Sequence, residues 1–116
     1  MSSKRRDKDF LGDIKEAVER IASYTKGLTY KKFFLDRKTQ DAVIRNFEII
    51  GEAAKNISKD LRAKHPEIQW KKISGLRDKL IHFYFGIDYK IVWNIARKEL
   101  PKLDKQIGTL LNKRHS

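Results

Sequence analysis

The sequence predicts an all-α protein, an up-and-down bundle of four to five helices. Apolar residues recur at spacings of three and four over long stretches, which is the pattern of helices that bury one face. Only two prolines, Pro66 and Pro101, fall within the 116 residues, which favours long helices. A chain of this length fits one domain, residues 1–116, because a single core can bury enough surface at this size without a metal or a disulfide.

The first helix is predicted to run from Phe10 to about Tyr24, and Gly27 provides its stop signal. The following segment, Leu28–Asp36, is expected to be a connector whose three apolar residues plug the end of the bundle. Its last residue, an aspartate, can cap the next helix with its carboxylate. The predicted plug consists of Phe33, Phe34 and Leu35.

A long second helix is predicted from Arg37 to about Ser58, because its apolar residues face one way and its charged residues face the other. We interpret the charged stripe as a solvated or interface face rather than a site. Asn46, on the flank of the stripe, could hydrogen-bond to the third helix. The apolar face comprises Val43, Ile44, Phe47, Ile50, Ala54 and Ile57, and the charged stripe comprises Asp41, Arg45, Glu48 and Glu52.

The third helix follows a short helical piece, Lys59–Lys64, which should end before His65 and Pro66 because proline disfavours helical geometry in the residue ahead of it. We expect the third helix to begin near Trp70 and to end at Gly86. Its tryptophan is predicted to pack inside the bundle, as large aromatic residues at helical spacing usually do.

The fourth helix is predicted to run from Tyr89 towards Asn112, with Asp88 as its N-cap. Pro101 should kink or interrupt it, because proline removes a backbone hydrogen bond within a helix. Trp93 is expected to pack in the bundle with the other tryptophan.

The composition limits the chemistry that is available. The chain has no cysteine, which excludes disulfides, thiolate catalysis and cysteine-based zinc sites and suits a reducing compartment, so we expect a cytoplasmic location. No apolar run reaches the roughly 18 to 20 residues that span a bilayer, and a soluble, unprocessed protein without membrane contact is expected. The formal charge of +12 favours a polyanionic partner, nucleic acid first, although scattered lysines also suit a very soluble helical protein.

No metal or other cofactor is predicted. The histidines, His65, His82 and His115, lie far apart in the sequence and lack the spacing of four residues that favours metal binding on a helix. The chain also lacks a glycine-rich phosphate loop, a serine nucleophile motif and a dinucleotide fingerprint.

The third helix carries an unusual set of polar residues on an apolar background. On a helical wheel Arg77 and Tyr84 lie at the edge of the core stripe, whereas His82 lies nearly opposite that stripe and shares a face with Asp78. The core stripe comprises Ile73, Leu76, Leu80 and Phe83.

Apolar residues on several sides of this helix suggest a second covering surface. Ile81, Phe83 and Phe85 make its end apolar nearly all round, which is typical of a helix buried on more than one side. The commonest source of such burial is a second copy of the chain in a two-fold dimer. We therefore expect a homodimer in which the two copies of the motif face each other across a cleft.

These residues suit cleavage of RNA without a metal. Histidine, with an unperturbed pKa near 6.5, can accept a proton from a ribose 2′-hydroxyl or donate one to the departing 5′-oxygen, which is the role suggested for His82. Arg77 can hold the phosphate and offset the charge of the transition state. Asp78 could orient the imidazole, and Tyr84 could bind phosphate or stack on a base.

Other interpretations remain open at this point. Arg77, His82 and Tyr84 could be ordinary boundary residues, with the arginine pairing to a carboxylate on the second helix. A basic helical DNA-binding module is a further candidate, although it would need a short exposed recognition helix. The long second and fourth helices fit a bundle better.

The segment Arg77–Tyr84 resembles the signature of HEPN domains, in which four residues separate an Arg from a His and one residue separates that His from a Tyr. It is similar in particular to the HepT-like toxin family, also called DUF86. The resemblance covers nearly the whole chain and includes DRKTQDAVIRNFEIIGEAAKNIS, HPEIQW, GLRDKLIH, YFGIDYKIVW and ELP. One departure is Phe83, where members often have glycine, and its bulk could narrow the cleft or change the dimer packing.

The resemblance implies a homodimeric, metal-independent endoribonuclease that is the toxin of a toxin–antitoxin pair. It implies that Arg77 and His82 are the catalytic pair, supported by Asp78. It also implies a partner, a small nucleotidyltransferase of the MNT type, which would block the site by attaching AMP to Tyr84. A HEPN protein that only binds RNA or nucleotide is the alternative within the same family.

Overall fold

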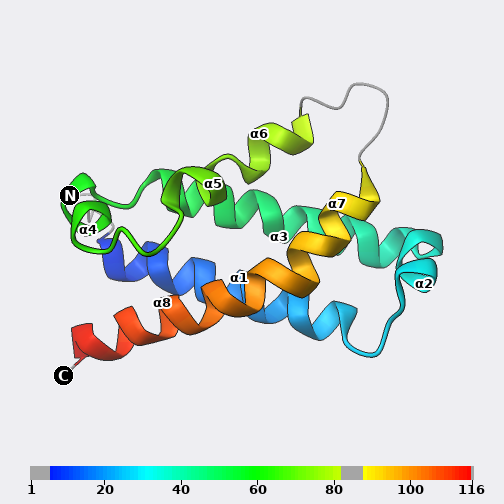
Figure 1. The fold of residues 1–116 in the computed structure, drawn as a ribbon, viewed down its shortest axis with the longest axis horizontal. Coiled ribbons are helices and arrows are strands. Elements are labelled where there is room, and N and C mark those ends of the chain that lie inside the picture. Colours follow the sequence, from blue (N-terminus) through cyan, green and yellow to red (C-terminus); the bar gives the residue numbers. More distant parts are fainter. Residues whose placement is uncertain (1–5, 82–87, 116) are drawn as a thin grey trace, which may run out of the picture.

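Three long helices form the body of the molecule. The computed structural model describes residues 6–81 and 88–115, and all elements in these ranges are helical. Helix α1 packs along both α3 and α8, and α5 and α6 lie against α3 (Figure 1). The bounds are α1 Asp7–Thr25, α2 Tyr30–Leu35, α3 Arg37–Lys55, α4 Lys59–Lys64, α5 Trp70–Ser74, α6 Leu76–Ile81, α7 Tyr89–Asn94, the π-helix η1 Ile95–Glu99 and α8 Leu100–His115.

The apolar faces predicted for the long helices meet in one core, which confirms the all-α prediction. The residues concerned are nearly all less than a tenth exposed, because each helix turns its apolar stripe inward and its charges outward. No described helix is both long enough and apolar enough to cross a membrane. The core includes Leu11, Ile14, Val18 and Ile21 of α1, Val43, Phe47, Ile50 and Ala54 of α3, and Leu103, Ile107 and Leu110 of α8.

The predicted helix ends are largely confirmed. Helix α1 ends at Thr25, and Gly27 follows with a φ of +76°, a value that favours glycine. Asp36 caps α3 by accepting a hydrogen bond from the backbone N–H of Thr39. Asp88 caps α7 in the same way. Local capping chemistry therefore sets these boundaries.

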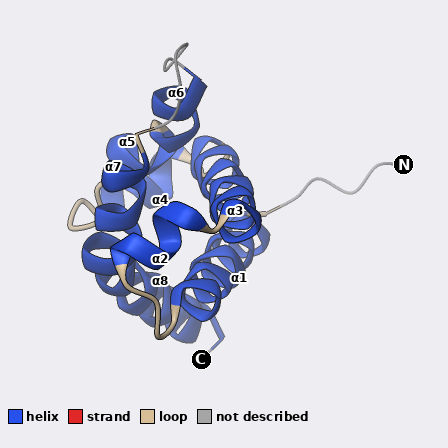
Figure 2. Cartoon of the chain, turned by 90° about the vertical axis from the view of Figure 1, so that its right-hand side faces the viewer, coloured by secondary structure: helices blue, strands red, loops and turns tan. Residues whose placement is uncertain are grey.

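The predicted connector Leu28–Asp36 contains a helix, α2, and the predicted plug is wrong in part. Phe33 is fully buried, but Phe34 is 53% exposed and Leu35 is 74% exposed. Six residues of helix turn successive side chains by about 100°, so three consecutive residues cannot all face the bundle. Figure 2, which looks at this end of the molecule, shows α2 lying across it.

The second predicted helix ends earlier than expected, at Lys55 rather than Ser58. The Arg62 side chain returns to this end and donates hydrogen bonds to the carbonyl oxygen of Lys55, the last residue of α3, and to that of Ile57, just beyond it. Ser58 instead caps α4 by accepting from Leu61 N–H, and its own N–H and hydroxyl donate to the Asp7 carboxylate. These bonds join the start of α1 to α4.

The third predicted helix begins at Trp70, as expected, but it is divided into α5 and α6. Gly75 lies between the two and donates its N–H back to Lys71. Trp70 is buried and its indole N–H donates to the His65 carbonyl oxygen. The predicted end at Gly86 and the predicted core residue Phe83 lie outside the described residues.

Pro101 interrupts the fourth predicted helix, as expected. The chain passes through α7, then the π-helical turn η1, then α8, in which Pro101 is the second residue. The N–H of Leu100 donates to the carbonyl oxygen of Ile95, five residues earlier. Proline has no N–H to donate, and a wider turn just before it accommodates the missing bond.

Candidate active site

Arg77 lies at the start of α6, where this helix crosses α3 at Gly51. A Cβ atom on Gly51 would be 3.2 Å from the backbone nitrogen of Arg77 and 3.3 Å from its Cβ. The absence of a side chain therefore allows the two backbones to approach closely. Sequence analysis missed the role of Gly51, although a glycine inside a helical pattern is a signal for such an approach.

The side chain of Arg77 is 45% exposed and lies beside α3. Its Nη1 atom is 3.5 Å from Oε2 of Glu52, which is itself 60% exposed. This contact confirms the simpler expectation that Arg77 pairs with a carboxylate on the second predicted helix. An ion pair that is long and open to water contributes little free energy. The guanidinium can therefore exchange this partner for another anion at small cost.

Asp78 makes a second contact with the same helix. Its Oδ1 atom lies 3.3 Å from Nζ of Lys55, and both side chains are exposed. The role suggested for Asp78 is to orient the imidazole of His82. A hydrogen bond from the imidazole to Asp78 would therefore compete with the ion pair to Lys55. The short helix α6 is joined to α3 through adjacent charged residues, Arg77 and Asp78.

An open groove of about 330 Å³ lies between α1, α3 and the Arg77 side chain. It includes Arg45, Glu48 and Glu52, so three of the four residues in the charged stripe face the same groove as Arg77. Arg45 and Glu48 pair loosely with each other, at 3.7 Å. The complete lining is Phe10, Asp13, Arg45, Glu48, Ile49, Glu52, Ala53, Asn56 and Arg77.

The charges of this groove are mixed. Its lining carries two arginines and three carboxylates, those of Asp13, Glu48 and Glu52. A phosphate that approaches Arg77 would therefore meet nearby negative charge as well as the guanidinium. The Glu52 carboxylate is the acid that is paired with Arg77, so its displacement would accompany phosphate binding.

The other two residues of the predicted site, His82 and Tyr84, lie outside the described residues. The structure thus places Arg77 and Asp78 on α6 and brings them together with Glu52 and Lys55 of α3. Within the described parts of the chain, no three His, Asp or Glu side chains gather as metal ligands would.

Asn46 does not reach the third predicted helix through any described residue. It is only 4% exposed, and its Nδ2 donates to the Ala42 carbonyl oxygen one turn earlier in α3. Its Oδ1 atom is buried and has no hydrogen-bond partner among residues 6–81 and 88–115. The predicted hydrogen bond from Asn46 to the motif therefore remains a prediction.

Comparisons with known proteins identify the relatives of this chain. The "Ribonuclease HepT-like" family matches residues 14–110. A "Probable ribonuclease HepT" of Thermococcus cleftensis is 49% identical over 100 residues, which cover 86% of this chain and 91% of that protein. The "Putative RNase MJ0127" of Methanocaldococcus jannaschii is 46% identical over 102 residues, which cover 88% of this chain and 84% of that protein.

A third relative is also named as an RNase. The "Putative RNase TTE0752" of Caldanaerobacter subterraneus is 43% identical over 104 residues, which cover 90% of this chain and 93% of that protein. No solved structure matches the chain significantly. The family match spans most of the sequence, and these relatives align with it over nearly their whole length. This all-α chain therefore belongs to the HepT-like ribonuclease family.

Proposed function

We propose that this protein is an endoribonuclease that cleaves RNA without a metal ion, with Arg77 and His82 as its catalytic pair. The observation that carries the proposal is the position of Arg77. Its guanidinium lies at the edge of an open groove, and its one ion pair among residues 6–81 and 88–115 is the weak pair to Glu52. The relatives named as ribonucleases and the formal charge of +12 support RNA as the substrate.

The proposed reaction uses the substrate's own hydroxyl. The ribose 2′-oxygen attacks the adjacent phosphorus and loses its proton, the bond from phosphorus to the 5′-oxygen breaks, and the 5′-oxygen gains a proton. The products are a 2′,3′-cyclic phosphate and a free 5′-hydroxyl. His82 supplies the proton transfer, because an imidazole exchanges protons near neutral pH.

Arg77 stabilises the negative charge that builds up on the phosphoryl oxygens. A guanidinium stays charged at every relevant pH and can donate two parallel hydrogen bonds to a phosphate. In the free protein the Glu52 carboxylate lies 3.5 Å from Nη1 of this guanidinium as an ion pair. Binding of the substrate phosphate displaces that carboxylate, so in the free protein Glu52 is the anion beside Arg77 that the phosphate replaces.

The active form is proposed to be a homodimer in which the sites of the two copies share one cleft. The support is the apolar character of Ile81, Phe83 and Phe85, which surround the predicted catalytic histidine in the sequence. Light scattering should then give a mass near twice the 13.7 kDa of one chain. A stable monomer at micromolar concentration would contradict the shared cleft.

The proposed partner is a small nucleotidyltransferase of the MNT type, with which the protein forms a cytoplasmic toxin–antitoxin pair. The transferase would attach AMP from ATP to the phenolic oxygen of Tyr84, with pyrophosphate as the leaving group. A nucleotide at this position would bring negative charge within two residues of His82. It would thereby repel the substrate and cover the site.

The reaction class is tested with purified protein in EDTA. The proposal predicts that unmodified single-stranded RNA is cut to fragments with 2′,3′-cyclic phosphate ends, which mass spectrometry identifies. An RNA of the same sequence with 2′-O-methyl groups should stay intact, because it has no 2′-hydroxyl to attack. Cleavage of the methylated RNA, or cleavage only after addition of a divalent metal, would overturn the proposed reaction.

A further inference from the structure

A cluster of aromatic and basic side chains lies at the end of the bundle formed by α2 and the start of α7. We define the α2–α7 patch by its four partly or largely exposed rings and two lysines. Phe33 lies beneath these rings, fully buried, and fixes the patch to the core. The patch consists of Tyr30, Lys31, Phe34, Tyr89, Lys90 and Trp93.

Phe34 is the exposed centre of this patch. Its ring is 6.0 Å from the ring of Tyr30 and 6.4 Å from that of Tyr89, centroid to centroid, yet the residue is 53% exposed. Contacts on two sides hold the ring in place, and the remaining side faces water. A flat apolar surface held in this way can accept another flat ring by stacking.

The backbone beneath Phe34 is fixed at both ends of α2. Thr29 caps the start of the helix by accepting from Lys32 N–H. At the other end, the buried amide of Gln40 donates to the carbonyl oxygens of Phe33 and Phe34 at 3.0 and 2.7 Å. The exposure of Phe34 is therefore a feature of an ordered helix rather than of a frayed end.

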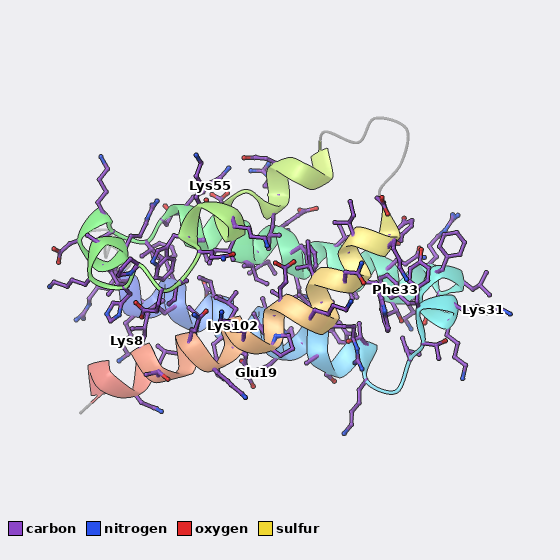
Figure 3. All side chains as sticks on the ribbon, in the orientation of Figure 1. Lys8, Glu19, Lys31, Phe33, Lys55 and Lys102 are labelled. Atoms are coloured by element: carbon purple, nitrogen blue, oxygen red, sulfur yellow. The ribbon has the colours of Figure 1, made fainter. Side chains whose placement is uncertain are left out.

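The surroundings of the patch are strongly basic. Segments 26–38 and 88–97 contain seven Lys or Arg residues and only two acids. Both acids, Asp36 and Asp88, use their carboxylates to cap helices. Among the described residues, neither Lys31 nor Lys32 forms an ion pair, and Lys90 Nζ lies 4.2 Å from the ring centre of Tyr30. Figure 3 shows Lys31 extending away from the bundle.

Charge and aromatic surface together decide which partner fits. Exposed rings with unpaired lysines form the type of platform on which single-stranded nucleic acids bind, because bases stack on the rings and phosphates contact the cations. A second copy of the same patch would bring like charges together, which opposes self-association here. A single strand of RNA complements both the exposed rings, through its bases, and the positive charge, through its phosphates.

The patch is also close to His82 along the chain, which limits the distance between them. Seven peptide links join His82 to Tyr89, so their Cα atoms are at most about 25 Å apart. Even at the spacing of about 3.4 Å per nucleotide found along one strand of a duplex, roughly seven nucleotides span that distance, and an extended single strand needs fewer. RNA bound on the patch can therefore extend to His82.

We propose that the α2–α7 patch binds a segment of single-stranded RNA flanking the cleavage site, with Phe34 as a base-stacking residue and Lys31 and Lys90 as phosphate contacts. This inference rests on the proposed ribonuclease function. It assigns substrate binding to an end of the bundle that the Arg77 groove does not include.

The test compares the full-length protein with three variants of α2. The probe is a fluorescently labelled 2′-O-methyl RNA, which cannot be cut, and its affinity is measured by anisotropy. Phe34→Ala should weaken binding about tenfold, as loss of one stacked base does, and should raise the KM for unmodified RNA while kcat is retained. Phe34→Trp should keep wild-type affinity. Leu35→Ala, which removes the neighbouring and even more exposed apolar side chain, should have no effect.

The outcomes separate this inference from the proposed function. If the wild type cleaves RNA and Phe34→Ala binds and cleaves as well as the wild type, the patch proposal is wrong and the ribonuclease remains. If Leu35→Ala weakens RNA binding as much as Phe34→Ala does, the effect is not due to base stacking and the proposal is again wrong. If Phe34→Ala changes the oligomeric mass but not RNA binding, the surface is a contact between protein chains and the proposal is also wrong. If the wild type neither binds nor cleaves RNA, the proposed function fails and the patch proposal fails with it.

Discussion

The guanidinium of Arg77 lies 3.5 Å from the carboxylate of Glu52, across the point where α6 crosses α3. Both side chains are about half exposed, and the geometry is that of a weak, solvent-screened ion pair. In a protein that binds phosphate through Arg77, such a carboxylate competes with the substrate. Glu52 should therefore tune the affinity of the site for RNA.

Replacing Glu52 by glutamine is expected to strengthen RNA binding. The change removes a competing charge but keeps the shape of the side chain, and loss of an exposed ion pair of about 0.2–1 kcal/mol corresponds to an affinity gain of up to about fivefold. The affinity of an uncleavable RNA should be measured at low and high salt. Glu48→Gln, in the same groove but paired with Arg45, is the matched control and should give a smaller gain. Equal gains in the two variants would mean that only the net charge matters.

Gly51→Ala is expected to lower the kcat of RNA cleavage strongly, while it lowers the free energy of unfolding only modestly. The new methyl group would press on the backbone of Arg77, which must move by a few tenths of an ångström. The overpacking lowers the free energy of unfolding by about 1–3 kcal/mol. The higher helix propensity of alanine raises it by about 1 kcal/mol. Urea unfolding should thus show only a modest loss, while kcat falls because the guanidinium is displaced.

The matched control for this variant is Gly12→Ala in α1. A Cβ atom on Gly12 would have no other atom within 4 Å, so the change should raise the free energy of unfolding by about 1 kcal/mol and leave cleavage unchanged. If Gly51→Ala behaves like Gly12→Ala in both measurements, the close crossing of α3 and α6 does not position Arg77.

Asp36 should make the stability of the α2–α3 corner depend on pH. Hydrogen bonds from the Thr39 hydroxyl and backbone N–H, at 2.6 and 3.0 Å, lower the pKa of the Asp36 carboxyl. Because the folded state has the lower pKa, the stabilisation is complete above the unfolded pKa, near 3.9, and is lost as the pH falls through the folded value. Asp36→Ala should therefore lower the urea midpoint at pH 7, and the difference from the wild type should shrink at pH 3. A difference that is constant with pH would show that ionisation of Asp36 is irrelevant.

Much of the fold could be predicted from the sequence because local rules determine it. The 3.6-residue apolar periodicity predicted the core, and Asp36, Gly27 and Asp88 marked helix ends through capping and backbone geometry. The break at Gly75 was missed because the apolar spacing of Ile73 and Leu76 continues across it. Apolar periodicity indicates which residues are buried, but it does not reveal that one turn departs from regular α-helical geometry.

The candidate site could be predicted less completely, because its partners depend on how helices cross. The sequence predicted Arg77 as a site residue and a carboxylate as its simpler partner, but several acids of α3 were available. The choice of Glu52 follows from the close approach at Gly51, which is a tertiary feature. The exposure of Phe34 and Leu35 likewise depends on how α2 is oriented at the end of the bundle.

Tyr84 is expected to be the residue that the partner transferase modifies. Co-expression with a cognate nucleotidyltransferase should add the mass of one or more AMP units, and Tyr84→Phe should prevent the addition because the acceptor oxygen is gone. Intact-protein mass spectrometry measures the change. Tyr24→Phe, an exposed tyrosine on α1, is the control and should still be modified. An adduct that persists in Tyr84→Phe would place the acceptor elsewhere.

The central claim, that Arg77 and His82 together cleave RNA without a metal, is tested most directly by single-turnover cleavage in EDTA. Arg77→Ala and His82→Ala should each lose cleavage by at least about a hundredfold, as expected for a phosphate-stabilising group and a general acid or base. Arg20→Ala and His65→Ala, which remove the same residue types from surface pairs with Glu16 and Glu67, should cleave like the wild type. Undiminished cleavage by either Arg77→Ala or His82→Ala, in correctly folded protein, would contradict the account.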